Sequence, residues 1–178
     1  MPARAGIWLL GLAVVVGTLY ALLSGSSTPV LLGRGTPAPP FELPRLGGAA
    51  PLRMADLDGK VVLINFWATW CKPCEDEMPA MERLYRALAG SDFELVAISV
   101  DDDVEAVAAF QKRLGLTFPI LLDTDQRIAG FYQTFRFPES ILIGRDGLVV
   151  ERYVGSKEWD GDAYIARVRE LLSGARSG

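Results

Sequence analysis

The two cysteines of the chain, Cys71 and Cys74, are separated only by Lys72 and Pro73. Because the chain has no histidine, imidazole metal sites and Cys-His or Ser-His nucleophile pairs are excluded, and catalysis must use thiols or carboxylates. A disulfide across so short a gap closes too small a loop to stabilise a fold much, and two thiols alone do not complete a four-ligand zinc site. The pair is therefore placed for thiol chemistry.

The cysteines lie at a predicted junction between a strand and a helix. The apolar run 61–68 (VVLINFWA) predicts a central strand covered on both faces, and the apolar spacing from Cys74 to Leu88 predicts a helix that begins near Cys71. Free backbone N–H groups at a helix N-terminus favour an anion and lower the pKa of the Cys71 thiol. We therefore predict that Cys71 attacks, and that the more buried Cys74 resolves the mixed disulfide.

The residues around the cysteines are expected to tune this chemistry. Lys72 favours the thiolate, whereas the acidic residues that follow Cys74 oppose it. Pro73 fits the first helical turn, where its missing N–H costs nothing. Trp70 is expected to shield the dithiol and to offer a contact surface for substrates.

The rest of the sequence predicts an α/β fold. A hairpin is expected within 41–57, and the periodicity then predicts parallel and antiparallel strands in one mixed sheet with helices on both faces. The expected strands are 93–100, 119–122, 140–143 and 148–154, and the expected helices are 104–114, 127–135 and 160–172.

The amino terminus predicts a single-pass membrane anchor. Residues 6–23 carry no charge, and 18 helical residues span about 27 Å. Arg4 precedes this run and no further charge follows until Arg34, so the positive-inside rule places the rest of the chain outside the cytoplasm. A cleaved signal peptide and a buried helix of a globular domain are the alternatives. We expect a linker at 24–40, the catalytic domain at 41–174 and a disordered tail at 175–178.

Charge and length narrow the classes of function. The chain has 178 residues, which fits one domain with an appendage, and its net charge of -4 offers no broad positive field for nucleic acid. Neither a resident metal nor another cofactor is expected. The predicted partners are protein thiols and disulfides, together with the membrane through residues 6–23.

Several motifs carry a resemblance to a known family. Gly59-Lys60, then VVLINFWATWCKPCEDEMPAM, then Tyr132 and Pro138-Glu139 resemble the TlpA/ResA/CcmG branch of the thioredoxin superfamily. The resemblance covers 35–172 and implies a thioredoxin-like fold on an anchored, periplasmic or otherwise extracytoplasmic protein. It also implies that a membrane electron donor of the thiol-relay type regenerates the dithiol.

The resemblance assigns further site residues. Asn65 stands where thioredoxin carries a buried aspartate, so another base is needed, and Glu77 is expected to accept the proton of Cys74. Pro138 matches the family's cis-proline, which leaves neighbouring backbone groups free for a substrate. The family usually has small residues before this proline, whereas this chain has Arg136 and Phe137, which we expect to shape substrate binding.

The function expected from these residues is thiol:disulfide oxidoreductase activity. The preferred direction is reduction of selected protein disulfides, as in cytochrome c maturation or copper-protein assembly. A disulfide oxidase or isomerase remains an alternative, because thioredoxin and DsbA, with potentials of about -270 and -120 mV, differ mainly in thiolate stabilisation. A Cu(I) carrier is the alternative from another class, since two thiolates suffice for that ion.

Overall fold

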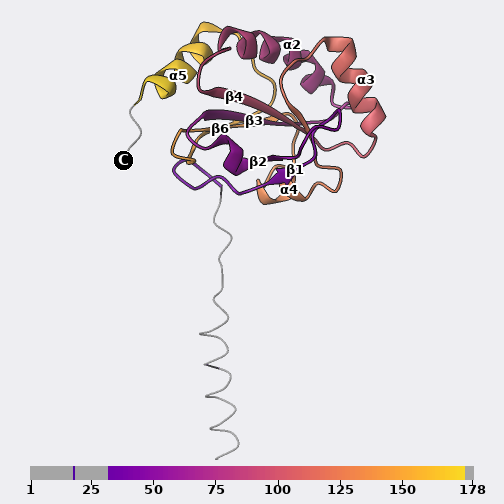
Figure 1. The fold of residues 1–178 in the computed structure, drawn as a ribbon, viewed down its shortest axis with the longest axis horizontal. Helices are drawn as coiled ribbons and strands as arrows, with labels where there is room; N and C mark the ends of the chain where they lie inside the picture. Colours follow the sequence, from indigo (N-terminus) through magenta and orange to yellow (C-terminus); the bar gives the residue numbers. More distant parts are fainter. Residues whose placement is uncertain (1–17, 19–31, 175–178) are drawn as a thin grey trace, which may run out of the picture. The chain divides into compact units, whose positions relative to one another are not determined.

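A five-stranded mixed sheet forms the centre of the computed structural model, which describes Thr18 and residues 32–174 (Figure 1). The strand order is β5-β4-β3-β6-β7; β3, β4 and β5 run parallel, whereas β6 and β7 are antiparallel to their neighbours. The strands span Val61–Trp67 (β3), Phe93–Ser99 (β4), Ile120–Leu122 (β5), Glu139–Ile143 (β6) and Val149–Val154 (β7).

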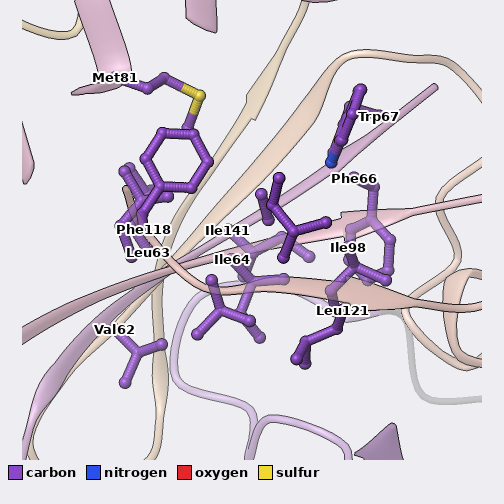
Figure 2. Close-up of a cluster of buried hydrophobic side chains, with 14 of the residues drawn as sticks. Val62, Leu63, Ile64, Phe66, Trp67, Met81, Ile98, Phe118, Leu121 and Ile141 are labelled. Atoms are coloured by element: carbon purple, nitrogen blue, oxygen red, sulfur yellow. The ribbon is translucent and has the colours of Figure 1, made fainter. Parts of the chain in front are cut away.

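Strand β3 is the middle of the sheet, as the apolar run predicted. All seven of its residues are buried, because β4 and β6 pair with its two edges and other elements cover both faces. Side chains alternate along a strand, so Leu63 and Trp67 share one face and Val62 and Ile64 the other. Figure 2 shows Leu63 beside Met81 and Phe118, with Val62 and Ile64 on the opposite side.

Helices cover both faces of the sheet (Figure 1). Helices α2 (Lys72–Ala87), α3 (Val104–Leu114) and α5 (Asp162–Ser173) lie on one side, and the short α4 (Arg127–Phe131) lies on the other. The predicted α/β architecture is therefore confirmed. Helix α4 ends four residues before the predicted limit of 135, because Gln133 adopts a positive φ of 53° and the chain turns toward Pro138.

The residues before β3 pack against the sheet. The expected hairpin is present as β1 (Glu42–Leu43) and β2 (Leu52–Arg53), followed by the 3-10 helix η1 (Met54–Leu57). Upstream of it, Gly35 N donates to Val149 O at 2.7 Å and Ala38 N donates to Gly147 O at 3.0 Å. The part of the predicted linker from residue 35 onward therefore lies against the domain.

Most of the predicted anchor lies outside the described residues, which include only Thr18 from 6–23. The tail 175–178 also lies outside them. Within the part of the chain that the structure describes, no helix has both the length and the apolar character that a membrane span requires.

Candidate functional site

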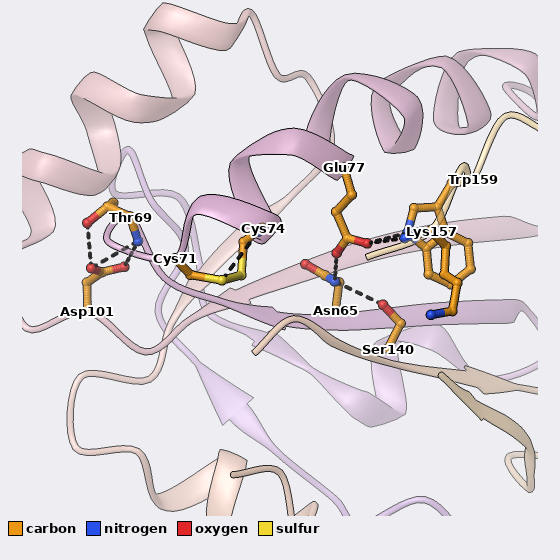
Figure 3. Close-up of a disulfide and its surroundings, with 9 residues drawn as sticks. All are labelled: Asn65, Thr69, Cys71, Cys74, Glu77, Asp101, Ser140, Lys157 and Trp159. Carbon is orange, nitrogen blue, oxygen red and sulfur yellow. Dashed lines mark hydrogen bonds between the residues drawn. A yellow bond between two sulfur atoms is a disulfide. The ribbon is translucent and has the colours of Figure 1, made fainter. Parts of the chain in front are cut away.

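The two cysteines form a disulfide at the start of α2, immediately beyond the end of β3 (Figure 3). Strand β3 ends at Trp67, and a turn closed by the bond from Cys71 N to Ala68 O brings Cys71 to the N-cap of the helix. Pro73 occupies the first turn, as predicted. The Cα atoms of the two cysteines are 5.3 Å apart.

The disulfide is asymmetric in its surroundings. Cys71 retains 6% of its surface exposed and Cys74 none, and Cys74 N donates to Cys71 Sγ at 3.3 Å. A backbone donor at a helix N-terminus stabilises negative charge on that sulfur when the disulfide opens. The arrangement agrees in direction with the predicted asymmetry, and the roles of attacker and resolver remain predictions.

The charged residues beside the cysteines are paired with one another. Lys72 is exposed and forms an ion pair with Asp76, which raises the pKa of the lysine. Arg113 of α3 pairs with Glu75 at 2.8 Å and lowers the pKa of that carboxyl. Asp76 therefore offsets much of the field that Lys72 exerts on the cysteines.

Glu77 differs from these acidic neighbours because it is buried, with 2% of its surface exposed. Figure 3 shows its carboxylate between Asn65 and the segment that carries Lys157 and Trp159. Its carboxylate accepts three hydrogen bonds: from Asn65 Nδ2 at 2.9 Å, from Lys157 N at 3.0 Å and from Trp159 Nε1 at 3.0 Å. Burial raises the pKa of Glu77, and the bonds from Trp159, Lys157 and Asn65 oppose that shift without cancelling it. Lys157 and Trp159 were not anticipated from the sequence.

Solvent approaches Glu77 from the side. A pocket of about 300 Å³ opens between α2 and the segment that links β7 to α5. Its lining residues are Asp76, Glu77, Ser156, Lys157 and Glu158. Glu77 therefore lies between the cysteines and this pocket.

Asn65 ties Glu77 to the neighbouring strand. Its Nδ2 also donates to Ser140 Oγ of β6 at 2.9 Å, whereas its buried Oδ1 has no hydrogen-bond partner among the described residues. Since an amide does not ionise, Asn65 orients the carboxylate of Glu77 and does not itself accept the proton of a thiol.

A second buried carboxylate fixes the turn that leads to Cys71. Asp101, which follows β4, accepts from Thr69 N at 2.9 Å, from Thr69 Oγ1 at 2.7 Å and from Ser99 Oγ at 2.7 Å (Figure 3). The sequence did not predict this contact, although the carboxyl ends of the parallel strands β3 and β4 must meet at one edge of the sheet.

The predicted substrate-binding residues lie beside the end of β3. The peptide bond between Phe137 and Pro138 is cis, as the resemblance implied, and the register pairs Phe66 with Glu139 directly after that proline. The ring of Phe137 meets the ring of Trp70 edge-on at 6.0 Å. Trp70 is 67% exposed and Arg136 is also exposed, so both are accessible to a partner.

Phe135 is a further exposed aromatic residue in the segment before Pro138. It is 77% exposed and was not anticipated as a site residue. The run of Phe135, Arg136 and Phe137 before a proline was the available signal. Among the described residues, no group of three or more Cys, Asp or Glu side chains is arranged to hold a metal ion.

Comparison with known proteins places this geometry in a family. The AhpC/TSA family profile matches residues 34–152. The thiol-disulfide oxidoreductase ResA of Bacillus thuringiensis (strain Al Hakam) is 40% identical over 85% of this chain and 86% of its own length. ResA of Bacillus subtilis (strain 168) is 35% identical over 86% of this chain and 84% of its own length.

Solved structures support the same assignment. A thiol:disulfide interchange protein of the thioredoxin family from Chlorobium tepidum TLS superimposes with a TM-score of 0.68 at 31% identity, over 79% of this chain and 98% of that one. A thiol-disulfide oxidoreductase from Bacteroides fragilis NCTC 9343 gives 0.66 at 28% identity, over 77% and 100%. The chain thus belongs to the AhpC/TSA family, as a thioredoxin-like thiol-disulfide oxidoreductase similar to ResA.

Proposed function

We propose that this enzyme reduces selected protein disulfides outside the cytoplasm, with its domain tethered to the membrane by residues 6–23. The observation that carries the exchange chemistry is the buried carboxylate of Glu77 on the same helix as a dithiol whose outer member is the N-cap, and the direction and the location are tested separately below. This arrangement separates the nucleophile from the base, and each acts in a different step.

The reaction consists of two exchanges. In the first, the Cys71 thiolate attacks one sulfur of the substrate disulfide, a mixed disulfide forms, and the departing substrate thiolate takes a proton from solvent. In the second, Cys74 gives its proton to Glu77 and attacks Cys71 Sγ, which closes the enzyme disulfide and releases the second substrate thiolate. Two electrons pass from the enzyme dithiol to the substrate, and a membrane thiol relay returns them.

Glu77 suits the second step because burial raises its pKa above that of an ordinary carboxylate, and so brings it nearer to the pKa of a thiol. The competing explanation is that acidic residues simply favour the first turn of a helix. That explanation fits Glu75 and Asp76, which form ion pairs with Arg113 and Lys72, better than it fits the buried Glu77.

The base is tested with Glu77→Gln, which keeps the size of the side chain and removes proton transfer. The resolution of a preformed mixed disulfide on Cys71 is followed by stopped flow between pH 6 and 9. We expect slower resolution in the variant with little change in fold. A rate equal to that of the wild type across this range would remove Glu77 from the mechanism.

The direction of transfer is tested by the redox potential of the Cys71/Cys74 pair. A reductant should lie nearer to the thioredoxin value of about -270 mV than to the DsbA value of about -120 mV. The potential is measured by equilibration with glutathione and thiol alkylation. A value near the DsbA end would favour the oxidase alternative.

Selectivity is attributed to two residues before Pro138, the exposed Arg136 and the half-buried Phe137. A large ring at Phe137, edge-on to the ring of Trp70, and a positive charge at Arg136 would exclude generic substrates. We expect insulin to be a poor substrate and Arg136→Gly to accelerate its reduction. Rapid insulin reduction that Arg136→Gly leaves unchanged would count against this mechanism.

The location is tested separately. The uncharged run 6–23 behind Arg4 supports an uncleaved anchor with the domain on the periplasmic side. Protease added to spheroplasts should digest the domain, and alkaline extraction should leave the full chain in the membrane. Apocytochrome c and proteins awaiting copper are the proposed substrates, to be sought as mixed disulfides of a Cys74→Ser chain.

A further inference from the structure

Trp159, which lies between β7 and α5, donates its indole N–H directly to the carboxylate of Glu77. The distance from Nε1 to Glu77 Oε2 is 3.0 Å, and Lys157 N donates to the same oxygen at 3.0 Å. We propose that Trp159 is a positioning residue of the exchange reaction: its N–H aims the Glu77 carboxylate and keeps it ionised, ready to accept the Cys74 proton. This inference rests on the proposed role of Glu77 as the base.

The indole is itself held in place. Its ring centroid lies 5.2 Å from that of Tyr153 of β7 and 5.0 Å from that of Tyr164 of α5, and 2% of the residue is exposed. Such aromatic contacts fix the ring, so the N–H reaches Glu77 without a further loss of side-chain freedom. The donor is therefore preorganised before substrate arrives.

The adjoining segment is fixed as well. Lys157 Nζ donates to the carbonyl oxygens of Val154, Gly155 and Ser156 at 2.7, 2.9 and 3.3 Å. These bonds shape the loop so that Lys157 N points at the carboxylate. Two donors from one short segment thus converge on a single oxygen of Glu77.

The groups around Glu77 determine whether loss of the Trp159 N–H raises or lowers the pKa of Glu77. Asn65 donates from β3, the cation of Lys157 stabilises the anion, and Asp76 and Glu158 share the lining of the neighbouring pocket. Among the influences that lower the pKa of Glu77, the bond from Trp159 is the largest. Removal of this N–H therefore raises the pKa further and reduces the ionised fraction at a given pH.

The decisive variant removes the N–H and nothing else. Replacing Trp159 by 3-benzothienylalanine, in which sulfur takes the place of the N–H, preserves the ring and its contacts with both tyrosines. The same exchange at Trp67 is a matched control, because Trp67 is fully buried and its Nε1 has no hydrogen-bond partner in the described part of the chain. Trp159→Phe serves as a second variant.

Two measurements are made on the full chain. Carbon-13 NMR of the glutamate carboxyls in the oxidised protein, assigned with Glu77→Gln, reports the pKa of Glu77 directly. The pH profile of mixed-disulfide resolution reports the base in action. A hydrogen bond to a charged group changes an ionisation constant about tenfold or more. We therefore expect the pKa of Glu77 and the midpoint of the resolution profile to rise by about one pH unit in the Trp159 variants, and neither to change in the Trp67 control.

The outcomes separate the two proposals. An unchanged pKa of Glu77 in the Trp159 variants, or an equal shift in the Trp67 control, would overturn the positioning role. A shifted pKa with an unshifted resolution profile would support the hold of Trp159 on Glu77 and overturn Glu77 as the base. A uniform loss of rate without either shift would mean that Trp159 only stabilises the fold.

Discussion

Asp101 gives the sharpest test of how the fold positions the dithiol. The residue is 5% exposed, and its carboxylate is the acceptor for both the backbone and the hydroxyl of Thr69, two residues before Cys71, as well as for Ser99. Asp101→Ala removes all of these bonds. Asp101→Asn keeps one oxygen and the size of the side chain, so it loses chiefly the bond from Ser99.

The cost of each change follows from which donors are left without a partner. Ser99 is fully buried, so its hydroxyl loses about 1 to 3 kcal/mol when no acceptor remains. Thr69 is half-buried and finds water, so its two bonds cost about 0.5 to 1 kcal/mol each. We therefore expect Asp101→Ala to lower the free energy of unfolding by about 3 kcal/mol, and Asp101→Asn by about 1 kcal/mol.

Urea unfolding of the oxidised protein, followed by tryptophan fluorescence, measures both values. Asp102→Ala is the control, because Asp102 is the exposed neighbour. Its effect should stay within about 0.5 kcal/mol. Equal losses for Asp101→Ala and Asp101→Asn would refute the account, since they would show that the hydrogen bonds to Thr69 contribute nothing.

Three further predictions concern the cysteines, the buried carboxylate of Glu82 and the core. In Cys74→Ser a mixed disulfide should accumulate on Cys71, detected by mass spectrometry; adducts on Cys74 of a Cys71→Ser chain alone would reverse the roles. Burial alone would raise the pKa of Glu82, but the hydrogen bonds from Thr117 and Arg86 outweigh it and lower that pKa. The ionised Glu82 therefore stabilises the fold above the ordinary carboxyl pKa, and this stabilisation is lost as the pH falls through the pKa of the folded state. Glu82→Gln should therefore be less stable than the wild type by about 1 kcal/mol at pH 7, with the difference shrinking below about pH 4 in urea titrations. Leu63→Ala should cost about 2 to 5 kcal/mol in the same assay, because Leu63 is 1% exposed on the central strand; a loss under about 1 kcal/mol would contradict this packing.

Local patterns were sufficient to predict the elements that carry the disulfide. The run 61–68 is apolar throughout because β3 is covered on every side, and Pro73 after Cys71 marks a helix start whatever lies around it. The same periodicities predicted the succession of strands and helices along the chain. The early end of α4 was missed because a glutamine at positive φ leaves no mark in composition.

The partners of the site residues were harder to predict, because they come from distant parts of the chain. Glu77 was identified as a candidate, but the sequence places Trp159 and Lys157 about 80 positions away, in a polar stretch before the last helix. Asp101 likewise looks like one of three loop aspartates until the edge of the sheet brings it to Thr69. Which acid is buried depends on tertiary packing, which no local pattern encodes.

The central place of β3 sets a contrast in timescales within a few residues. Its amides bond to β4 on one side and to β6 on the other, so they exchange hydrogen with solvent only when the whole sheet opens, the rarest event available to the fold. The sulfurs at the end of the same strand must change partners in every turnover. The amide hydrogens that we expect to exchange most slowly therefore lie next to the disulfide that breaks and re-forms in every turnover, and the strand that positions the cysteines stays paired throughout.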